Sequence, residues 1–174
     1  AAVPAGRLRP QVAQFFATGS VADGSVLRRG RLEARFLPFM PQARYDELLW
    51  ACDWNFVRGE DSFVRALWAA RPLIWHIYPQ AERAHWAKLD AFLDAYCEAL
   101  EPEPAGALRA LWHAWNGVGD ARADGSVRMF AAWPALARHQ ACLARHARDW
   151  AARAAAAGNL AEKLARFCED RLKS

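Results

Sequence analysis

Two hydrophobic periods run through the first half of the chain, and together they predict strands and helices in turn. Residues 31–37 alternate apolar with charged side chains, which is the two-residue period of a strand. Residues 54–57 and 73–77 are short apolar runs, typical of strands that are buried on both faces. Helical spacing precedes or separates these strands at residues 8–16, 41–52 and 62–70. With a strand end at residues 1–4, this order predicts an α/β fold built on a parallel sheet.

The pattern becomes helical after Gln80, and no further strand is indicated. The predicted helices are residues 82–99, 105–116, 126–157 and 159–172. We expect a loop at residues 117–125. Pro134 is expected to start or kink a helix, and Gly158 to separate the last two helices.

The composition is that of a folded protein, because 54% of the 174 residues are hydrophobic and nine are Trp. We predict a single domain over residues 1–174, with an α/β part at 1–80 and a mainly helical part at 81–174. The chain begins with Ala1-Ala2-Val3-Pro4, without Met or a leader pattern, so we expect it to be a piece of a longer protein. No apolar run has the length of a membrane span, and no membrane partner is expected.

Charge and cysteine content narrow the function classes further. The net charge is +4, but the arginines are scattered among alanines and form no compact basic run, which argues against nucleic-acid binding. The four cysteines lie far apart and outside metal-ligand spacings, so we expect free thiols in a reducing cytoplasm and no metal. No P-loop, Gly-rich dinucleotide motif or zinc-protease motif is present.

Three loops that follow predicted strands carry the candidate chemistry: residues 38–42, 58–62 and 76–80. The carboxyl ends of parallel strands share one edge of a sheet, so we expect the three loops to lie side by side. They offer two aromatic rings, an amide, a hydroxyl and a cation, from Phe39, Tyr78, Gln42, Ser62 and Arg58. Such a set suits a nucleotide diphosphate, whose base stacks and whose phosphates bind Arg and helix amides.

Simpler interpretations of the same residues remain open. Glu60, Asp61 and Ser62 are residues that helix starts favour, because their oxygens can cap free amides and carboxylates suit the helix dipole. Arg58 could pair with Asp61. His76 lies inside an apolar run and is more often a hydrogen-bonded core histidine than a functional one. Of the residues in this turn, Glu60 is the one that capping explains least.

Four segments resemble a known family, the EarP protein-arginine rhamnosyltransferases, which modify bacterial elongation factor P. The segments are Leu37-Pro38-Phe39-Met40-Pro41-Gln42, residues 45–53, Asn55-Phe56-Val57-Arg58-Gly59-Glu60-Asp61-Ser62-Phe63-Val64-Arg65-Ala66 and Trp75-His76-Ile77-Tyr78-Pro79-Gln80. The resemblance implies two facing Rossmann-like lobes, the GT-B arrangement, of which this chain would be the C-terminal, donor-binding lobe. It also implies an inverting, metal-independent transfer of rhamnose from dTDP-β-L-rhamnose to an arginine of elongation factor P. The family's N-terminal lobe, with its proposed aspartate base, has no counterpart here, so we expect the chain alone to be inactive.

The resemblance also assigns roles to individual residues. It implies that Phe39 and Gln42 contact thymine, and that Tyr78 and Arg58 hold the diphosphate-sugar. Asp61 and Ser62 would contact phosphate or ribose. Glu60 would be the catalytically important carboxylate, with Arg58 stabilising the leaving nucleotide.

Two other functions remain open. One is the donor lobe of a different GT-B enzyme, a UDP-sugar glycosyltransferase or epimerase, which a preference for UDP would reveal. The other is a non-catalytic interaction module, whose basic helical part docks an acidic protein such as elongation factor P.

Overall fold

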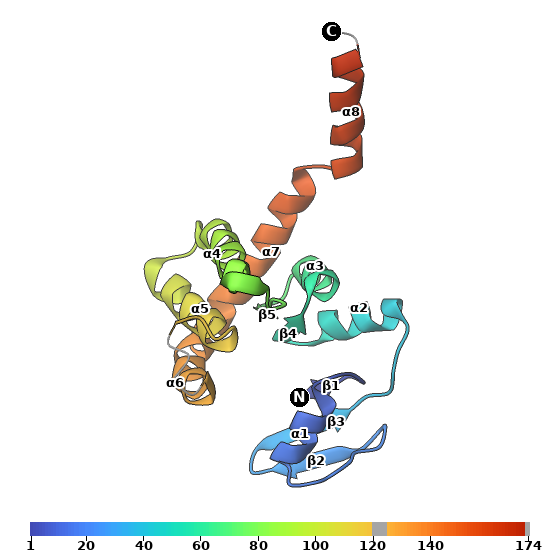
Figure 1. The fold of residues 1–174 in the computed structure, drawn as a ribbon, viewed down its shortest axis with the longest axis vertical. Helices are drawn as coiled ribbons and strands as arrows, with labels where there is room; N and C mark the ends of the chain where they lie inside the picture. The colour runs from blue at the N-terminus through green and yellow to red at the C-terminus, as the bar shows by residue number, and fades with distance from the viewer. Residues whose placement is uncertain (120–124, 173–174) are drawn as a thin grey trace. The chain divides into compact units, whose positions relative to one another are not determined.

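The computed structural model describes residues 1–119 and 125–172, and the chain divides into two compact units (Figure 1). The first unit is Ala1–Glu47 and the second is Leu48–Ser174. Helix α2 (Gln42–Ala51) begins in the first unit and ends in the second. Residues 120–124 of the predicted loop at 117–125 lie outside the described residues.

The first unit is a three-stranded sheet with one helix. Its elements are β1 (Ala2–Val3), α1 (Arg9–Phe15), β2 (Val26–Arg29) and β3 (Leu32–Phe36). The strand order is β1-β3-β2, with β1 parallel to β3 and β2 antiparallel to it. The alternation that predicted a strand at 31–37 is confirmed, because Ala34 and Phe36 point into the core and Val12 packs against them. The sequence did not predict β2, whose residues are mostly exposed.

The second unit contains a parallel β-α-β unit. Strands β4 (Asn55–Arg58) and β5 (Leu73–His76) pair in parallel, with α3 (Glu60–Trp68) as the crossover helix. Phe63 of α3 stacks on Trp75 of β5 with ring centroids 4.0 Å apart, which fixes the helix on the sheet. Both strands and the helix between them confirm the elements that the apolar runs predicted.

The expected single parallel sheet is wrong in one respect, because the described strands form two separate sheets. The sheet of the first unit also contains an antiparallel pair. A strand as short and polar as β2 gives no apolar period, so nothing in the sequence distinguished its hairpin from a loop.

The rest of the second unit is helical. Its elements are the 3₁₀ turn η1 (Ala81–Arg83) and helices α4 (Ala84–Cys97), α5 (Pro102–Trp115), α6 (Gly125–Ala137), α7 (Gln140–Ala156) and α8 (Leu160–Leu172). Pro134 lies inside α6, and the break in the predicted long helix comes after Ala137. Gly158 adopts a φ of 83° between α7 and α8, as its position predicted. All four cysteines are free.

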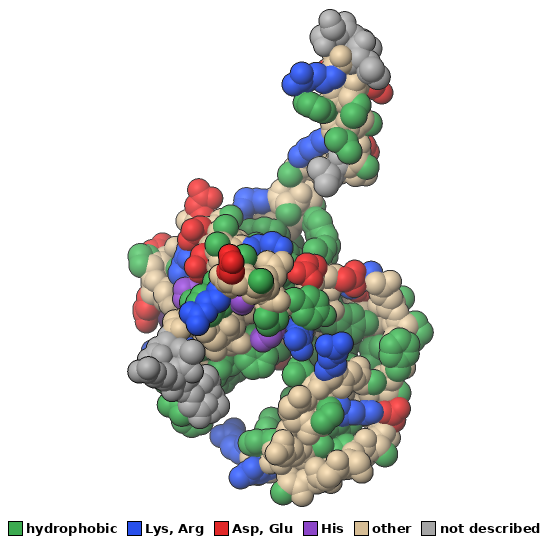
Figure 2. Space-filling view, in the orientation of Figure 1, with side chains coloured by type: hydrophobic (Ala, Val, Ile, Leu, Met, Phe, Trp, Pro, Cys, Tyr) green, Lys and Arg blue, Asp and Glu red, His purple; other side chains and the backbone are tan. Residues whose placement is uncertain are grey.

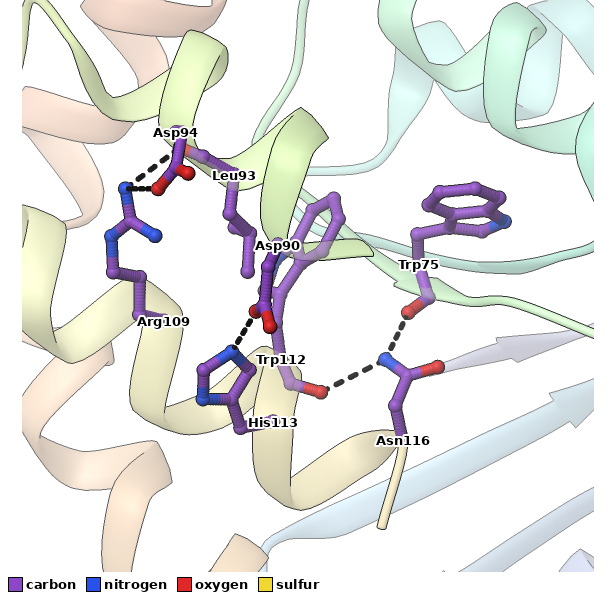
Figure 3. Close-up of polar contacts among 8 residues, drawn as sticks. All are labelled: Trp75, Asp90, Leu93, Asp94, Arg109, Trp112, His113 and Asn116. Carbon is purple, nitrogen blue, oxygen red and sulfur yellow. Dashed lines mark hydrogen bonds and ion pairs between the residues drawn. The ribbon is translucent and has the colours of Figure 1, made fainter. Parts of the chain in front are cut away.

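Helix α5 completes the open edge of β5, where strand groups would otherwise lack partners. The Trp112 indole N–H donates to the Leu73 carbonyl over 3.1 Å. One turn later, Asn116 donates to the Trp75 carbonyl over 2.8 Å (Figure 3). The Asn116 side chain also accepts from the Ile77 N–H over 2.9 Å. A side chain of α5 and that of its C-cap residue Asn116 thereby replace a third strand and fix the segment that leads out of β5.

Charged side chains of both signs lie on the face that Figure 2 shows. In Figure 2, Lys and Arg side chains alternate with acidic and apolar ones and form no single basic patch on the face shown. Within the described residues, no helix is long and apolar enough to cross a membrane.

Candidate functional site

Gly59 forms the turn between β4 and α3, and two hydrogen bonds to β5 hold it there. Its N–H donates to the His76 carbonyl over 3.1 Å, and its own carbonyl accepts from the Trp75 indole over 2.9 Å. The backbone has φ 73° and ψ −179°, a conformation that is nearly restricted to glycine. A Cβ at this position would lie 2.6 Å from Cε2 of Tyr78. The turn therefore requires a glycine for two separate reasons.

The start of α3 differs from the capping arrangement that the sequence predicted. Gly59 is the N-cap residue and has no side chain to cap with, so Glu60, Asp61 and Ser62 occupy the first turn instead. Asp61 pairs with Arg65 one turn later over 3.1 Å, and not with Arg58. The carboxylates of Glu60 and Asp61 suit the positive end of the helix.

Arg58 and Tyr78 come together at the carboxyl ends of β4 and β5. The Arg58 guanidinium lies over the Tyr78 ring, 5.1 Å from its centroid, in a cation–π contact. The Tyr78 ring is 46% exposed, whereas Nε of Arg58 is buried and has no hydrogen-bond partner among the described residues. The structure thus brings together two of the residues for which the sequence predicted a diphosphate-binding role.

His76 ends β5 directly opposite Arg58 in the strand register. Its ring meets the edge of Trp115, with centroids 6.1 Å apart. Its Nδ1 is buried and makes no hydrogen bond to the described residues, so the interpretation as a hydrogen-bonded core histidine does not hold at this atom. Burial, and then the nearby charge of Arg58, lower the pKa of His76, which favours the neutral imidazole.

The loop after Tyr78 is held by a histidine to which the sequence assigned no role. Nδ1 of buried His85 accepts the Gln80 N–H over 3.0 Å. Asn116 was also missed, although it fixes the backbone on both sides of His76. Neither residue stands in a motif. Only the packing of α4 and α5 against β5 reveals them.

Phe39 and Gln42 belong to the first unit. Phe39 is 87% exposed in the loop that follows β3, and Gln42 is the first, exposed residue of α2. Their predicted contact with a base, and their convergence with the loops of the second unit, stay predictions. Among the described residues, no group of three or more His, Cys, Asp or Glu side chains could hold a metal ion.

The family model for EarP, the elongation factor P (EF-P) rhamnosyltransferase, matches residues 1–169. The chain belongs to this family. A protein-arginine rhamnosyltransferase of Pseudomonas putida is 46% identical over 98% of the chain, and one of Pseudomonas aeruginosa is 45% identical over 97%. The match spans 43% of each of these two EarP relatives, so the chain has less than half their length.

A solved structure from work on EarP-mediated arginine glycosylation of EF-P has the same fold. It superposes with a TM-score of 0.81 at 42% identity, over 97% of this chain and 51% of that one. The resemblance inferred from the four sequence segments is confirmed at the level of the EarP family.

Proposed function

We propose that this chain is the donor-binding part of an arginine rhamnosyltransferase that acts on elongation factor P. The observation that carries the proposal is the EarP family match over residues 1–169. The donor would be dTDP-β-L-rhamnose, bound in a Rossmann-like lobe of a GT-B enzyme. Because the chain covers 43% of its relatives, the complete reaction would need further sequence.

The geometry at the β4–α3 turn supports binding of a diphosphate. Gly59 leaves the first amides of α3 without a side-chain cap, and free helix amides attract phosphate. Arg58 supplies a positive charge at the end of β4, directly before this turn, and the Tyr78 ring lies against it. In our proposal, Asp61 and Ser62 contact phosphate or ribose from the first turn of α3, and Phe39 and Gln42 contact thymine.

Catalysis would follow from the same groups. In an inverting displacement the leaving dTDP gains negative charge, and Arg58 with the helix amides can stabilise that charge without a metal. Glu60 is exposed at the first position of α3. A carboxylate there is repelled by a diphosphate, so we assign it to the sugar or to the cationic guanidinium of the acceptor arginine. An enzyme that modifies a translation factor would work in the cytoplasm.

Calorimetric titration of the folded chain with dTDP tests donor binding. We expect binding in the micromolar to millimolar range, because part of the pocket lies outside this chain, and weaker binding by Arg58→Ala. Arg148→Ala, on α7, is a matched control that should leave the affinity unchanged. Tighter binding of UDP than of dTDP would favour a different GT-B enzyme. No binding of either nucleotide at millimolar concentration would contradict the proposal.

Rhamnosylation of EF-P by the full-length enzyme tests the role of Glu60. Glu60→Ala should lower kcat by about a hundredfold or more and leave the KM for the donor nearly unchanged. Glu98→Ala, at the end of α4, is the matched control and should retain activity. A variant at Glu60 with an unchanged kcat would remove this residue from the catalytic proposal.

A further inference from the structure

His76 and Arg58 share one face at the end of the β4–β5 sheet. They are paired in register, and side chains of directly paired residues in parallel strands point to the same side. Phe56, two residues before Arg58, lies on that side too, and Trp115 contacts both Phe56 and His76. Val57 and Trp75 point to the opposite side, where Trp75 stacks on Phe63 of α3. Ile74, paired in register with Phe56, lies on this side as well, so the two polar side chains end an otherwise apolar face.

Each of these two side chains has one buried nitrogen without a partner. Arg58 and His76 are partly exposed residues, but Nε of Arg58 and Nδ1 of His76 are buried and make no hydrogen bond within residues 1–119 and 125–172. Buried polar atoms in folded proteins are usually satisfied, and an unsatisfied one is explained by strain, a functional role, or a bound water or ion. Nε of Arg9 and Nε1 of Trp86 and Trp115 are also buried without a partner among the described residues, but Arg58 and His76 are the two that are paired in register at the strand ends. Both atoms can donate a hydrogen bond, provided that the neutral imidazole carries its proton on Nδ1.

We infer that Nδ1 of His76 and Nε of Arg58 bind the same phosphate oxygen of the nucleotide donor. The inference rests on the proposed function and adds His76 to its binding residues. An anionic oxygen is the acceptor that two neighbouring donors would share, one of them cationic. Asn116 positions His76 for this contact, because it holds the backbone on both sides, at Trp75 and at Ile77.

Three substitutions separate the contact made by Nδ1 from packing of the ring. His76→Asn keeps a donor near the position of Nδ1, His76→Gln moves the donor toward the position of Nε2, and His76→Phe removes both. In calorimetric titrations with dTDP, we expect His76→Asn to bind within about threefold of wild type. His76→Gln and His76→Phe should each bind about tenfold or more weakly. Arg58→Lys keeps the positive charge but removes the Nε donor. If the two donors share one oxygen, this substitution should weaken dTDP binding less in a chain that already carries His76→Phe than in the wild-type chain.

The outcomes separate this inference from the proposed function. If wild type binds dTDP and His76→Phe binds equally well, the role of His76 is refuted and the proposed function stands. Equal weakening by Asn and Phe would refute the contact with Nδ1. If the wild-type chain does not bind dTDP, both the proposed function and the role of His76 are refuted. If a variant does not fold, imidazole ¹⁵N spectra of the wild-type chain provide a second test. The Nδ1 signal of His76 should shift when inorganic pyrophosphate is added. A signal that shifts with neither pyrophosphate nor dTDP refutes the contact.

Discussion

Replacing Gly59 by Ala tests whether the β4–α3 turn is held by its backbone conformation and by its contact with Tyr78. A residue with a Cβ in this region of φ and ψ costs about 1–3 kcal/mol. The added methyl would also lie 2.6 Å from the Tyr78 ring, and such overpacking costs about 1–3 kcal/mol more. We therefore expect Gly59→Ala to lower the free energy of unfolding by about 2–6 kcal/mol. That loss is a large share of the total free energy of unfolding of a typical domain, which is about 5–15 kcal/mol.

Tyr78 is about half exposed, so its ring has space to move away from the turn and relieve part of that clash, at the expense of its contact with Arg58. Combining Gly59→Ala with Tyr78→Ala removes the steric part and leaves the backbone part. The double variant should thus lose about 1–3 kcal/mol less than the sum of the two single changes.

Urea unfolding followed by Trp fluorescence measures these differences, with Gly106→Ala as the matched control. Gly106 lies in α5 with open space around its Cβ position and no positive φ. Alanine there should stabilise the chain by about 0.4–1 kcal/mol. If Gly59→Ala unfolds within about 0.5 kcal/mol of wild type, both the strained backbone and the close approach of Tyr78 are refuted.

Two further substitutions test how the second unit is held together. Asn116→Ala should lower the free energy of unfolding by about 2–4 kcal/mol, because Trp75 and Ile77 lose their hydrogen bonds at the strand edge; a change below 1 kcal/mol would show that water replaces the amide. Nε2 of His146 donates to the Tyr96 carbonyl. Burial lowers the pKa of His146 in the folded chain below the unfolded value of about 6.5. The stability that the neutral imidazole contributes is therefore complete above about pH 6.5 and is lost as the pH falls toward the pKa of the folded chain. His146→Gln, measured by urea unfolding from pH 7.5 to 5, should reduce the acid slope of stability by up to about 1.4 kcal/mol per pH unit, and an unchanged slope would contradict the assignment.

The local elements were predictable because each has a clear period or boundary residue. The run at 73–77 is apolar except for His76 and forms β5, and the alternation at 31–37 forms β3. Pro102 stands at the first turn of α5, three residues before the predicted start, because proline is tolerated there. Sheet membership was not predictable in the same way. Strand pairing depends on contacts between residues that are distant in sequence, and β2 has no apolar period from which a strand could be predicted.

The candidate site was predictable only where a residue stands in a motif. Arg58 and Tyr78 were named from their loops, and the structure places them in contact. Asn116 and His85 act on the same loop from helices that follow it, and no local pattern marks either residue. For His76 the apolar run favoured a core histidine over a functional one, but hydrophobic context does not reveal whether a buried nitrogen has a partner.

The missing cap of α3 follows from the geometry of the turn. Ser, Asp or Asn at an N-cap would accept a bond from a first-turn amide, but these residues normally require an extended backbone there. The turn into α3 has φ 73° and lies against Tyr78, which makes any side chain at residue 59 unfavourable. Glycine costs only a few tenths of a kcal/mol relative to those caps, roughly, so the fold loses little. The same constraint leaves the first amides open next to Arg58, and a phosphate bound there would take the place of the cap.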